Sequence, residues 1–435
     1  MIKLLSAATL LFLSLTAFAQ SVDEKLGSAM NSSDFFGLYD TYNNTDKATI
    51  NPFLEVFSRC MIGNRFNRPD ISIPAFDELL KTQSENLDLN LLLQCSAMYS
   101  MDLSRVGKND MAHDLLSSVL SAAYQMVDSV SLKPYADMAA RYQALTPYSP
   151  YQITINGSEG IIPFDTIPVG KPDSGQYLMQ INGQINGNNA KITFDTGAGA
   201  NVITDSLAAV YGLELLDAKA SVTGIDSSVG HYAIAKELKL GNIKITNVPF
   251  YVIDISSHNE EADKYLGILE VIIGSELMLQ LKDVTLDFTS KEIVIPKIAT
   301  EPANVRPNMC FSTGMNLLAN AEINGEPILI ILDSGDASYG SLTKSFFEQN
   351  KEMLTSECKS DTIRHGGVGG VWEVPCYRLP DAILSLAGNK VKIPSIPVMI
   401  EGQNNIRYNN LGIRSMMLYS KLRFNLVDMV ITTEL

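Results

Sequence analysis

The chain has 435 residues and a formal net charge of −15 at pH 7, from 33 basic and 48 acidic residues. Nucleic acid is therefore an unfavourable partner, because binding to phosphates relies on clustered Lys and Arg. The four histidines are not spaced like the ligands of a zinc motif, so the sequence indicates no metal site and no other cofactor.

Residues 1–19 have the pattern of a secretory signal peptide. Lys3 supplies the positive start, residues 4–15 are largely apolar, and Ala17-Phe18-Ala19 forms a small-residue cleavage pattern. The apolar stretch is too short to span a membrane, and no later run reaches that length. We expect an exported protein, periplasmic or extracellular, with no membrane span.

Residues 20–148 are predicted to form a helical domain. Their apolar residues recur at positions i, i+3, i+4 and i+7, which is the spacing of helices with one buried face. The clearest stretch comprises Phe53, Val56, Phe57, Cys60 and Met61. We expect roughly five or six short helices, with Pro74 at the start of one and Asn109-Asp110 at the start of another. Such a domain could bind a protein partner, cover a cleft as a pro-segment does, or stabilise the rest of the chain.

The helical pattern stops at Thr146-Pro147-Tyr148-Ser149-Pro150, because two prolines so close together end a helix. Beyond this point, alternating β segments separated by glycine and proline turns predict strands. Three such segments cover residues 177–181, 233–240 and 248–253. A second break, residues 296–307, divides this region, so we expect a first β lobe at residues 149–300 and a second at residues 301–435.

Each predicted lobe contains one short acidic triplet at the end of an apolar strand. The triplets are Asp195-Thr196-Gly197 and Asp333-Ser334-Gly335, offset by 138 residues. Two further landmarks flank both triplets at the same offset: Ile185-Asn186-Gly187 and Ile323-Asn324-Gly325 before them, Ile272-Ile273-Gly274 and Asn410-Leu411-Gly412 after them. Landmarks repeated at one offset indicate a duplicated structural unit.

A duplicated Asp-Thr/Ser-Gly can bring two carboxylates together. Like charges about 3 Å apart cannot both ionise, so one carboxyl stays protonated while its neighbour is a carboxylate. The carboxylate can take a proton from a water lying between them, while the acid donates a proton to the carbonyl oxygen that the water attacks. This chemistry needs no metal and no covalent intermediate.

At these residues the sequence resembles the aspartic peptidases of the pepsin and retropepsin type. Residues 366–374, Gly-Gly-Val-Gly-Gly-Val-Trp-Glu-Val, resemble the glycine-rich flap of the retroviral proteases, and residues 272–278 resemble their closing glycine and helix. The resemblance covers about residues 177–435. It implies two mainly β lobes on one chain, so no homodimer is needed. The expected fold class is therefore multidomain, with an all-α N-terminal domain followed by two mainly β lobes.

The resemblance also implies roles for individual residues. Asp195 and Asp333 become the catalytic pair, Thr196 and Ser334 become hydroxyls that hydrogen-bond across the lobe interface, and Gly197 and Gly335 form tight turns. The residues of the flap that would cover an extended peptide or protein substrate and bind its main chain are Gly366, Gly367, Val368, Gly369 and Gly370.

The chain departs from the family pattern at two places. Asp336 follows the second triplet, where Ala198 follows the first. If the Asp336 side chain faces the cleft, it adds a third carboxylate that raises the proton affinity of the pair; alternatively it turns outward to solvent or caps the next element. In the first lobe, residues 222–232 occupy the flap position without a clear glycine-rich run.

Five cysteines in an exported protein permit disulfides, with at least one thiol left over. Cys60 with Cys95, and Cys358 with Cys376, are plausible pairs. Buried free thiols are an equally good interpretation.

These observations favour a secreted aspartic endopeptidase that hydrolyses peptide bonds through a water activated by an Asp dyad. The alternative is a non-catalytic bilobal peptide-binding module of the cell envelope, with Asp336 and the altered first flap as marks of lost chemistry. In a third interpretation, the helical domain is the functional part, a scaffold with the lobes as an appendage.

Overall fold

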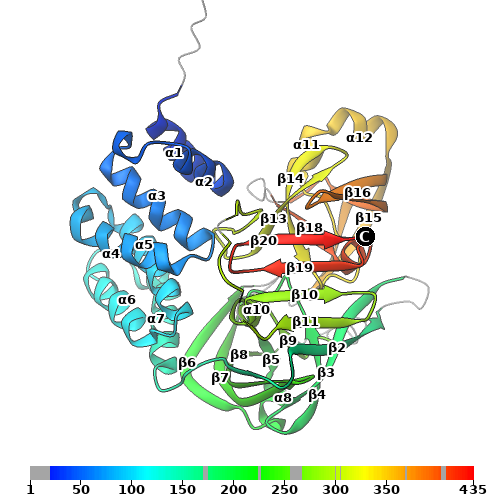
Figure 1. The fold of residues 1–435 in the computed structure, drawn as a ribbon, viewed down its shortest axis with the longest axis horizontal. Coiled ribbons are helices and arrows are strands. Elements are labelled where there is room, and N and C mark those ends of the chain that lie inside the picture. Colours follow the sequence, from blue (N-terminus) through cyan, green and yellow to red (C-terminus); the bar gives the residue numbers. More distant parts are fainter. Residues whose placement is uncertain are drawn as a thin grey trace, which may run out of the picture.

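The computed structural model describes residues 20–169, 175–223, 227–254, 267–298, 300–303, 305–367, 370–402 and 408–435. The predicted signal peptide, residues 1–19, lies outside these residues. An all-helical N-terminal region is followed by two β-rich lobes, as the sequence predicts (Figure 1). Within the described part of the chain, no helix combines the length and the apolar character needed to cross a membrane.

The described N-terminal region contains more α-helices than the sequence led us to expect. They are α1 (Val22–Asn31), α2 (Phe35–Asn43), α3 (Pro52–Arg65), α4 (Pro69–Thr82), α5 (Leu89–Arg105), α6 (Asn109–Ala123) and α7 (Ser129–Leu145). Side chains cap several of them: Ser21 and Glu24 form a reciprocal capping box at α1, and Asp88 accepts a hydrogen bond from an amide in the first turn of α5. The predicted start at Pro74 is wrong, since Pro74 lies inside α4. Pro69 occupies the first turn instead, where a helix needs no N–H.

The five cysteines are all free thiols, so neither predicted disulfide is present. Cys60, Cys95, Cys310 and Cys376 are buried. Cys60 and Cys95 pack as small apolar side chains in the core of the helical domain. The interpretation as buried free thiols is the correct one for these residues.

The first lobe is built mainly from antiparallel strands. Its elements are β1 (Gln152–Ile155), β2 (Glu159–Pro168), β3 (Tyr177–Ile185), β4 (Asn188–Phe194), β5 (Val202–Thr204), α8 (Asp205–Val210), β6 (Glu214–Thr223), β7 (Ser227–Leu240), β8 (Ile243–Ile253), β9 (Val271–Ile273), α10 (Ser275–Leu281), β10 (Asp283–Asp287) and β11 (Glu292–Pro296). The three segments predicted as strands are confirmed within β3, β7 and β8.

The second lobe repeats much of this plan. Its elements are β12 (Met309–Phe311), β13 (Leu317–Ile323), β14 (Glu326–Asp333), α11 (Lys344–Gln349), α12 (Lys351–Glu357), β15 (Lys359–Gly367), β16 (Gly370–Leu386), β17 (Asn389–Met399), β18 (Tyr408–Gly412), α13 (Ile413–Met416), β19 (Lys421–Asn425) and β20 (Val430–Glu434).

Corresponding hairpins lead into the two acidic triplets. The β3–β4 hairpin turns at Asn186 and Gly187, and the β13–β14 hairpin turns at Asn324 and Gly325. All four turn residues have positive φ, between 49° and 87°. Asn-Gly is the preferred pair for such two-residue hairpins, because both positions require the left-handed region. The repeated Ile-Asn-Gly therefore fixes the register of both strands that carry an aspartate.

A shared sheet joins the lobes. Strand β19, from the C-terminal end of the chain, pairs antiparallel with β10 of the first lobe, with Val284 opposite Phe424. The order continues from β20 through β19, β10, β11 and β2 into the sheet of the first lobe. Val284, Phe424 and their neighbours belong to a continuous apolar core that extends through both lobes. The two triplets are therefore held in a fixed relation by sheet pairing and core packing.

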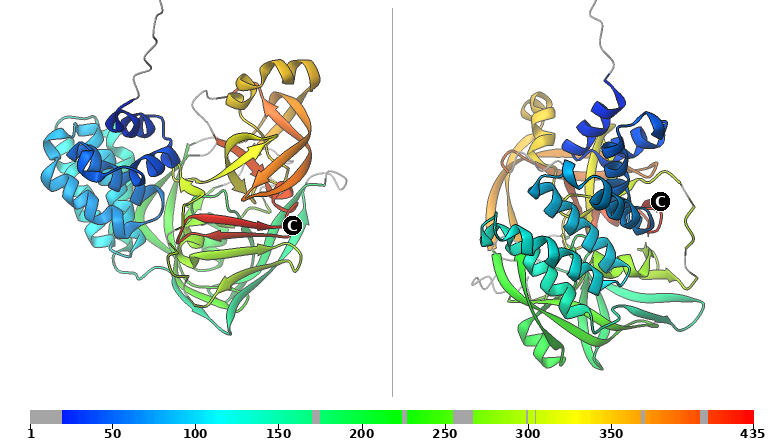
Figure 2. Two further views of the ribbon diagram at one scale, coloured as in Figure 1. Left: turned by 45° about the horizontal axis from the view of Figure 1, so that its top comes forward. Right: turned by 90° about the vertical axis from the view of Figure 1, so that its left-hand side faces the viewer.

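The helical domain packs along one side of the lobes and contacts both of them (Figure 2). From α7, the Arg141 guanidinium pairs with Glu276 of α10 and lies 5.3 Å from the ring centroid of Tyr251 in the first lobe. From α3, Arg65 donates to the carbonyl oxygen of Ser312 in the second lobe at 2.8 Å, and Arg65 is 4% exposed. The helices thus rest on an interface that includes buried polar contacts.

Candidate active site

Parallel strand pairing positions both aspartates. Strand β4 ends at Phe194, beside Ile273 of β9, and Asp195 donates its backbone N–H to the Ile273 carbonyl oxygen at 2.9 Å. Strand β14 ends at Asp333, which pairs with Gly412 of β18. The sequence places an apolar strand before each triplet, and these strands carry the aspartates to corresponding places in the two lobes.

The loop after each aspartate closes tightly around a glycine. A Cβ atom at Gly274 would lie 2.6 Å from the Ala198 carbonyl oxygen, and one at Gly412 would lie 2.6 Å from the Asp336 carbonyl oxygen. Both positions therefore require glycine on steric grounds. This explains why a glycine follows each triplet at the same spacing.

Each aspartate accepts hydrogen bonds from its own loop. Asp195 Oδ1 accepts from the amides of Gly197 at 2.9 Å and Ala198 at 3.1 Å. Asp333 Oδ1 accepts from the amide of Gly335 at 2.9 Å and from that of Asp336 at 3.2 Å. The same oxygen is used in each lobe, so the inner carboxylate oxygens are anchored by the backbone.

Thr196 and Ser334 tie the two loops together. The Thr196 amide donates to Ser334 Oγ at 3.0 Å, and the Ser334 amide donates to Thr196 Oγ1 at 3.1 Å. Each hydroxyl in turn donates to a carbonyl of the opposite strand, Thr196 to Leu332 at 2.5 Å and Ser334 to Phe194 at 2.6 Å. Both side chains are buried. The predicted positions of these two hydroxyls across the lobe interface match this geometry.

The two carboxyl groups meet at this junction. A Cβ atom at Gly197 would lie 2.5 Å from Asp333 Oδ1, and one at Gly335 would lie 2.6 Å from Asp195 Cγ. Each glycine of the triplets therefore packs against the aspartate of the other lobe, where only a hydrogen fits. The side chains of Asp195 and Asp333 also hydrogen-bond to each other.

The two aspartates differ in their proton affinity. Burial raises the pKa of Asp195, whereas hydrogen bonds from Asp333 and from the Gly197, Ala198 and Gly335 amides act in the opposite direction. Burial, followed by the negative charges of Asp195 and Asp336, raises the pKa of Asp333 well above its usual value. Both pKa values are raised, so the pair holds a proton more firmly than an isolated carboxyl group does.

Asp336 has the capping role that one of the two sequence interpretations predicts. Its Oδ1 accepts hydrogen bonds from the Ser338 amide at 2.9 Å and the Ser338 hydroxyl at 2.7 Å, as a capping residue does. Its Oδ2 accepts from Asn410 Nδ2 at 2.8 Å. It does not point freely into solvent, and its charge acts on Asp333. The sequence analysis did not identify Asn410 as a polar partner, although Asn410 stands where the first copy has Ile272.

The predicted flap is a hairpin of β15 and β16. Gly366 pairs with Val371, and Gly367 pairs with Gly370 across the end of the hairpin. Val368 and Gly369, also predicted to bind substrate, lie outside the described residues. In the first lobe β6 and β7 form the corresponding hairpin, where Thr223 pairs with Ser227.

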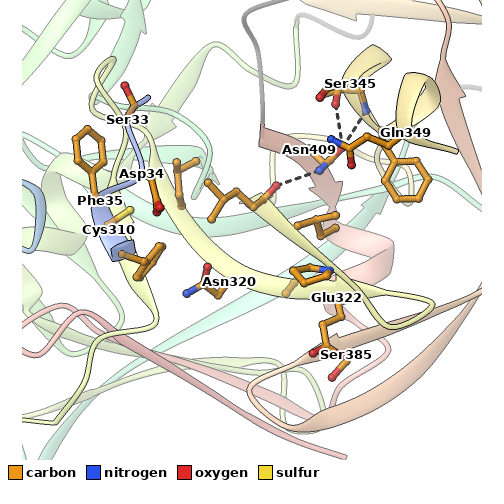
Figure 3. Close-up of a pocket in the computed structure, with 18 of the residues that line it drawn as sticks. Ser33, Asp34, Phe35, Cys310, Asn320, Glu322, Ser345, Gln349, Ser385 and Asn409 are labelled. Atoms are coloured by element: carbon orange, nitrogen blue, oxygen red, sulfur yellow. Dashed lines mark hydrogen bonds between the residues drawn. The ribbon is translucent and has the colours of Figure 1, made fainter. Parts of the chain in front are cut away.

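A cavity of about 710 Å³ lies between the helical domain and the second lobe (Figure 3). It is bordered by Asp34 and Phe35 at the start of α2, by Asn320 and Glu322 of β13, and by Gln349 of α11. None of the residues predicted for the active site lines it. Sequence patterns do not predict this cavity, because it forms between segments that are distant in the chain.

The first acidic triplet lies in a segment that matches the model of a known protein family. Residues 181–277 match the model of the family described as aspartyl protease. No curated protein matches the chain. Basic 7S globulin from soybean is similar in structure, with 10% sequence identity, a TM-score of 0.39, and coverage of 65% of this chain and 95% of the globulin.

Two further solved structures resemble the chain. Conglutin gamma, a basic 7S globulin from lupine seeds, is 11% identical, with a TM-score of 0.38 and coverage of 62% of this chain and 93% of its own. A retropepsin-like aspartic protease from Rickettsia conorii is 19% identical, with a TM-score of 0.22 and coverage of 33% of this chain and 92% of its own.

Proposed function

Since residues 181–277 match an aspartyl protease domain, we propose that the protein is an aspartic endopeptidase with Asp195 and Asp333 as its catalytic pair. One observation carries the proposal. The glycine of each triplet packs against the carboxyl group of the other lobe, so the two carboxyls, 138 residues apart in sequence, lie within reach of one water.

The proposed reaction follows from a pair that shares one proton. The ionised carboxylate takes a proton from the water while the water oxygen attacks the carbonyl carbon of the peptide bond. The protonated partner donates its proton to the carbonyl oxygen. The tetrahedral intermediate then collapses as a proton passes to the leaving amine and the C–N bond breaks. The loop amides of Gly197 and Gly335 hold the inner carboxylate oxygens throughout, which preserves the geometry without a metal.

We propose that the substrate is a peptide or protein segment in extended conformation. A hairpin such as β15–β16 can exclude water and pair with the main chain of an extended ligand. Gly366, Gly367 and Gly370, near the end of this hairpin, carry no side chains that could obstruct the approach of a main chain. The helical domain is available for a separate protein partner or for stabilising the lobes.

The alternative, a peptide-binding module without catalysis, predicts no need for two half-buried carboxyls that repel each other. Placing like charges together in a buried site destabilises a protein unless one group is protonated. Asp195 and Asp333 nevertheless lie together here, each aligned by two loop amides. This arrangement favours the enzyme over the module.

Incubation of the chain from Gln20 onward with denatured casein and a mixed peptide library, from about pH 3 to 8, separates the possibilities. We expect cleavage that a statine-type transition-state mimic inhibits. Tight peptide binding without turnover at any pH would instead support the module. A partner retained by the helical region, with neither binding nor cleavage of peptides, would support the scaffold.

We also propose that the protein is exported. The proposal rests on Lys3, the apolar residues 4–15 and the Ala17-Phe18-Ala19 pattern. N-terminal sequencing of the protein recovered outside the cytoplasm should begin at Gln20. An intact Met1 would contradict export through this signal.

A further inference from the structure

We propose that Asp336, fixed by Asn410 and Ser338, is a positioning residue that places the shared proton on Asp333 and moves the working pH range of the pair upward. Asp333 is then the general acid for the carbonyl oxygen, and Asp195 is the general base for the water. This inference rests on the proposed function and deepens it, because it assigns a separate role to each lobe.

Hydrogen bonds within its own loop and from β18 hold Asp336 in position. Its backbone amide donates to Asp333 Oδ1 at 3.2 Å, so a hydrogen bond within one loop joins Asp336 to Asp333. Its carboxylate accepts from the amide and hydroxyl of Ser338 and from Asn410 Nδ2. Three donors surround its carboxyl oxygens, and the side chain is only partly exposed. The Asp336 carboxyl group is therefore held in one place beside the pair.

The corresponding place in the first lobe is apolar. Ala198 and Ile272 stand where the second lobe has Asp336 and Asn410, and they pack with Val202, Leu269 and other apolar side chains. Since the two loops otherwise use the same backbone hydrogen bonds, this polar pair is the clearest difference between the surroundings of the two aspartates. A symmetric dyad would share its proton equally, and this difference removes the symmetry.

Other charges do not neutralise Asp336 within the described residues. Its own loop carries Asp333 and Tyr339, and Asp195 lies across the lobe junction. The elements hydrogen-bonded to this loop carry Tyr177 of β3, Tyr408 of β18 and Arg414 of α13. The Arg414 guanidinium stacks over the Tyr339 ring, 4.1 Å from its centroid, and donates to the Tyr339 hydroxyl at 3.3 Å. No described ion pair joins Arg414 to Asp336, so the carboxylate is held by neutral donors.

The sign of the effect follows from electrostatics. A nearby negative charge disfavours ionisation of Asp333, so it raises the pKa at which the pair loses its last proton. The active form carries one proton and is lost as the pH rises through that value. Removing the charge of Asp336 should therefore move the alkaline limb of the pH–kcat/KM profile to lower pH. The acidic limb, which reports protonation of Asp195, should move less, because Asp195 lies in the other lobe.

The test uses Asp336→Asn, which keeps the side-chain shape and leaves hydrogen bonding to Ser338 and Asn410 possible after amide rotation. We expect the alkaline limb to move down by about one pH unit, as expected for the loss of one charge near a buried acid. The matched control is Asp381→Asn, which removes one charge from an exposed carboxylate that pairs with Lys392. This control should leave both limbs in place. An unchanged alkaline limb in a folded Asp336→Asn protein would overturn the proposal.

A second measurement does not depend on turnover. With 13C-labelled aspartate side chains, the Asp333 carboxyl signal, assigned by its loss in Asp333→Asn, should titrate at lower pH in the Asp336→Asn protein than in the wild type. If this shift occurs but no variant and no wild type cleaves peptides, the electrostatic role stands and the proposed function fails. If the Asp333 titration is unchanged, the role of Asp336 fails whatever the activity.

If Asp336→Asn does not fold, the double variant Asp336→Ala/Asn410→Ile replaces it. This variant copies the Ala198 and Ile272 pair of the first lobe and removes Asp336 together with its Asn410 donor, while the part-buried Ser338 amide and hydroxyl lose their acceptor. A smaller fall of the alkaline limb and of the Asp333 titration is expected, because the variant also removes the Asn410 hydrogen bond that lowers the pKa of Asp333. The variant Asn410→Asp retains the carboxyl group of Asp336, so it should not lower the alkaline limb or the pH at which Asp333 titrates. A downward shift of either in Asn410→Asp would contradict the proposal.

Discussion

The loops that follow Asp195 and Asp333 share one backbone plan and differ at one pair of side chains. In both loops, the aspartate accepts hydrogen bonds from two backbone amides of the loop. A glycine further along the chain, Gly274 or Gly412, packs directly against the loop backbone. The first lobe surrounds its loop with the apolar pair Ala198 and Ile272, and the second with the polar pair Asp336 and Asn410. Shared backbone geometry brings the carboxyls together, and the side-chain difference makes them chemically unequal.

The largest effect should come from the glycines at the junction. In Gly335→Ala the new Cβ would lie 2.6 Å from Asp195 Cγ, so the carboxyl must move. A displacement of this kind in a catalytic pair costs about a hundredfold in rate or more. The measurement is kcat/KM on a peptide substrate. Gly199→Ala is the matched control, since Gly199 has open space around its Cα and the variant should keep its activity. Equal rates for both alanine variants would contradict the packing described.

The hydroxyls that cross the junction should contribute to stability in both lobes. Thr196→Val and Ser334→Ala each leave buried partners without a hydrogen bond, which costs about 1–3 kcal/mol of unfolding free energy. Urea unfolding measures the loss. Thr196→Ser keeps the hydroxyl and should recover most of it. If Thr196→Ser is as unstable as Thr196→Val, the hydroxyl is not the reason for the residue.

The pair should also make stability depend on pH. The folded-state pKa values of Asp195 and Asp333 are raised above the unfolded value. Their contribution to the free energy of unfolding is therefore fully present below the unfolded-state pKa, which is about 4. It is lost as the pH rises through their folded-state pKa values. The difference between the melting temperatures of the wild type and of Asp333→Asn should therefore fall as the pH rises through the folded-state pKa values. A difference that rises with pH would contradict the assigned direction.

The smallest effects should come from the contacts between the helical domain and each lobe. Arg141 pairs with Glu276 of the first lobe with side chains 20% and 21% exposed, whereas Arg306 of the second lobe pairs with Asp40 at 55% and 41% exposure. Arg141→Gln should cost about 1 kcal/mol or more, and Arg306→Gln only a few tenths, because exposed pairs are screened by water. Chemical unfolding measures both. The reverse order would indicate that the helices depend mainly on the second lobe.

Local patterns predicted much of the fold. The Asn-Gly turns, the apolar strands before each aspartate and the glycines after them are short-range signals, and each lies where the repeat indicates. The contacts between distant segments could not be read in this way. The pairing of β19 with β10 joins residues far apart in sequence, and nothing in either strand specifies its partner.

The same limit applies to the site. The triplets predicted that Asp195 and Asp333 occupy equivalent places, because similar backbone loops need similar residues. The role of Asp336 depended on which way its side chain turned, and this was decided by Asn410, which comes 74 residues later. A sequence repeat reveals what the two lobes share, whereas their difference becomes interpretable only when the neighbours of each side chain are known.

The central claim is that Asp195 and Asp333 act as one catalytic unit. Cleavage of a peptide substrate should be measured for Asp195→Asn, Asp333→Asn and the double variant at the optimal pH of the wild type. We predict that each single variant loses at least about a hundredfold in kcat, and that the double variant is no slower than the singles, because removal of either partner disables the pair. Losses that multiply in the double variant, or full activity in either single variant, would contradict the claim.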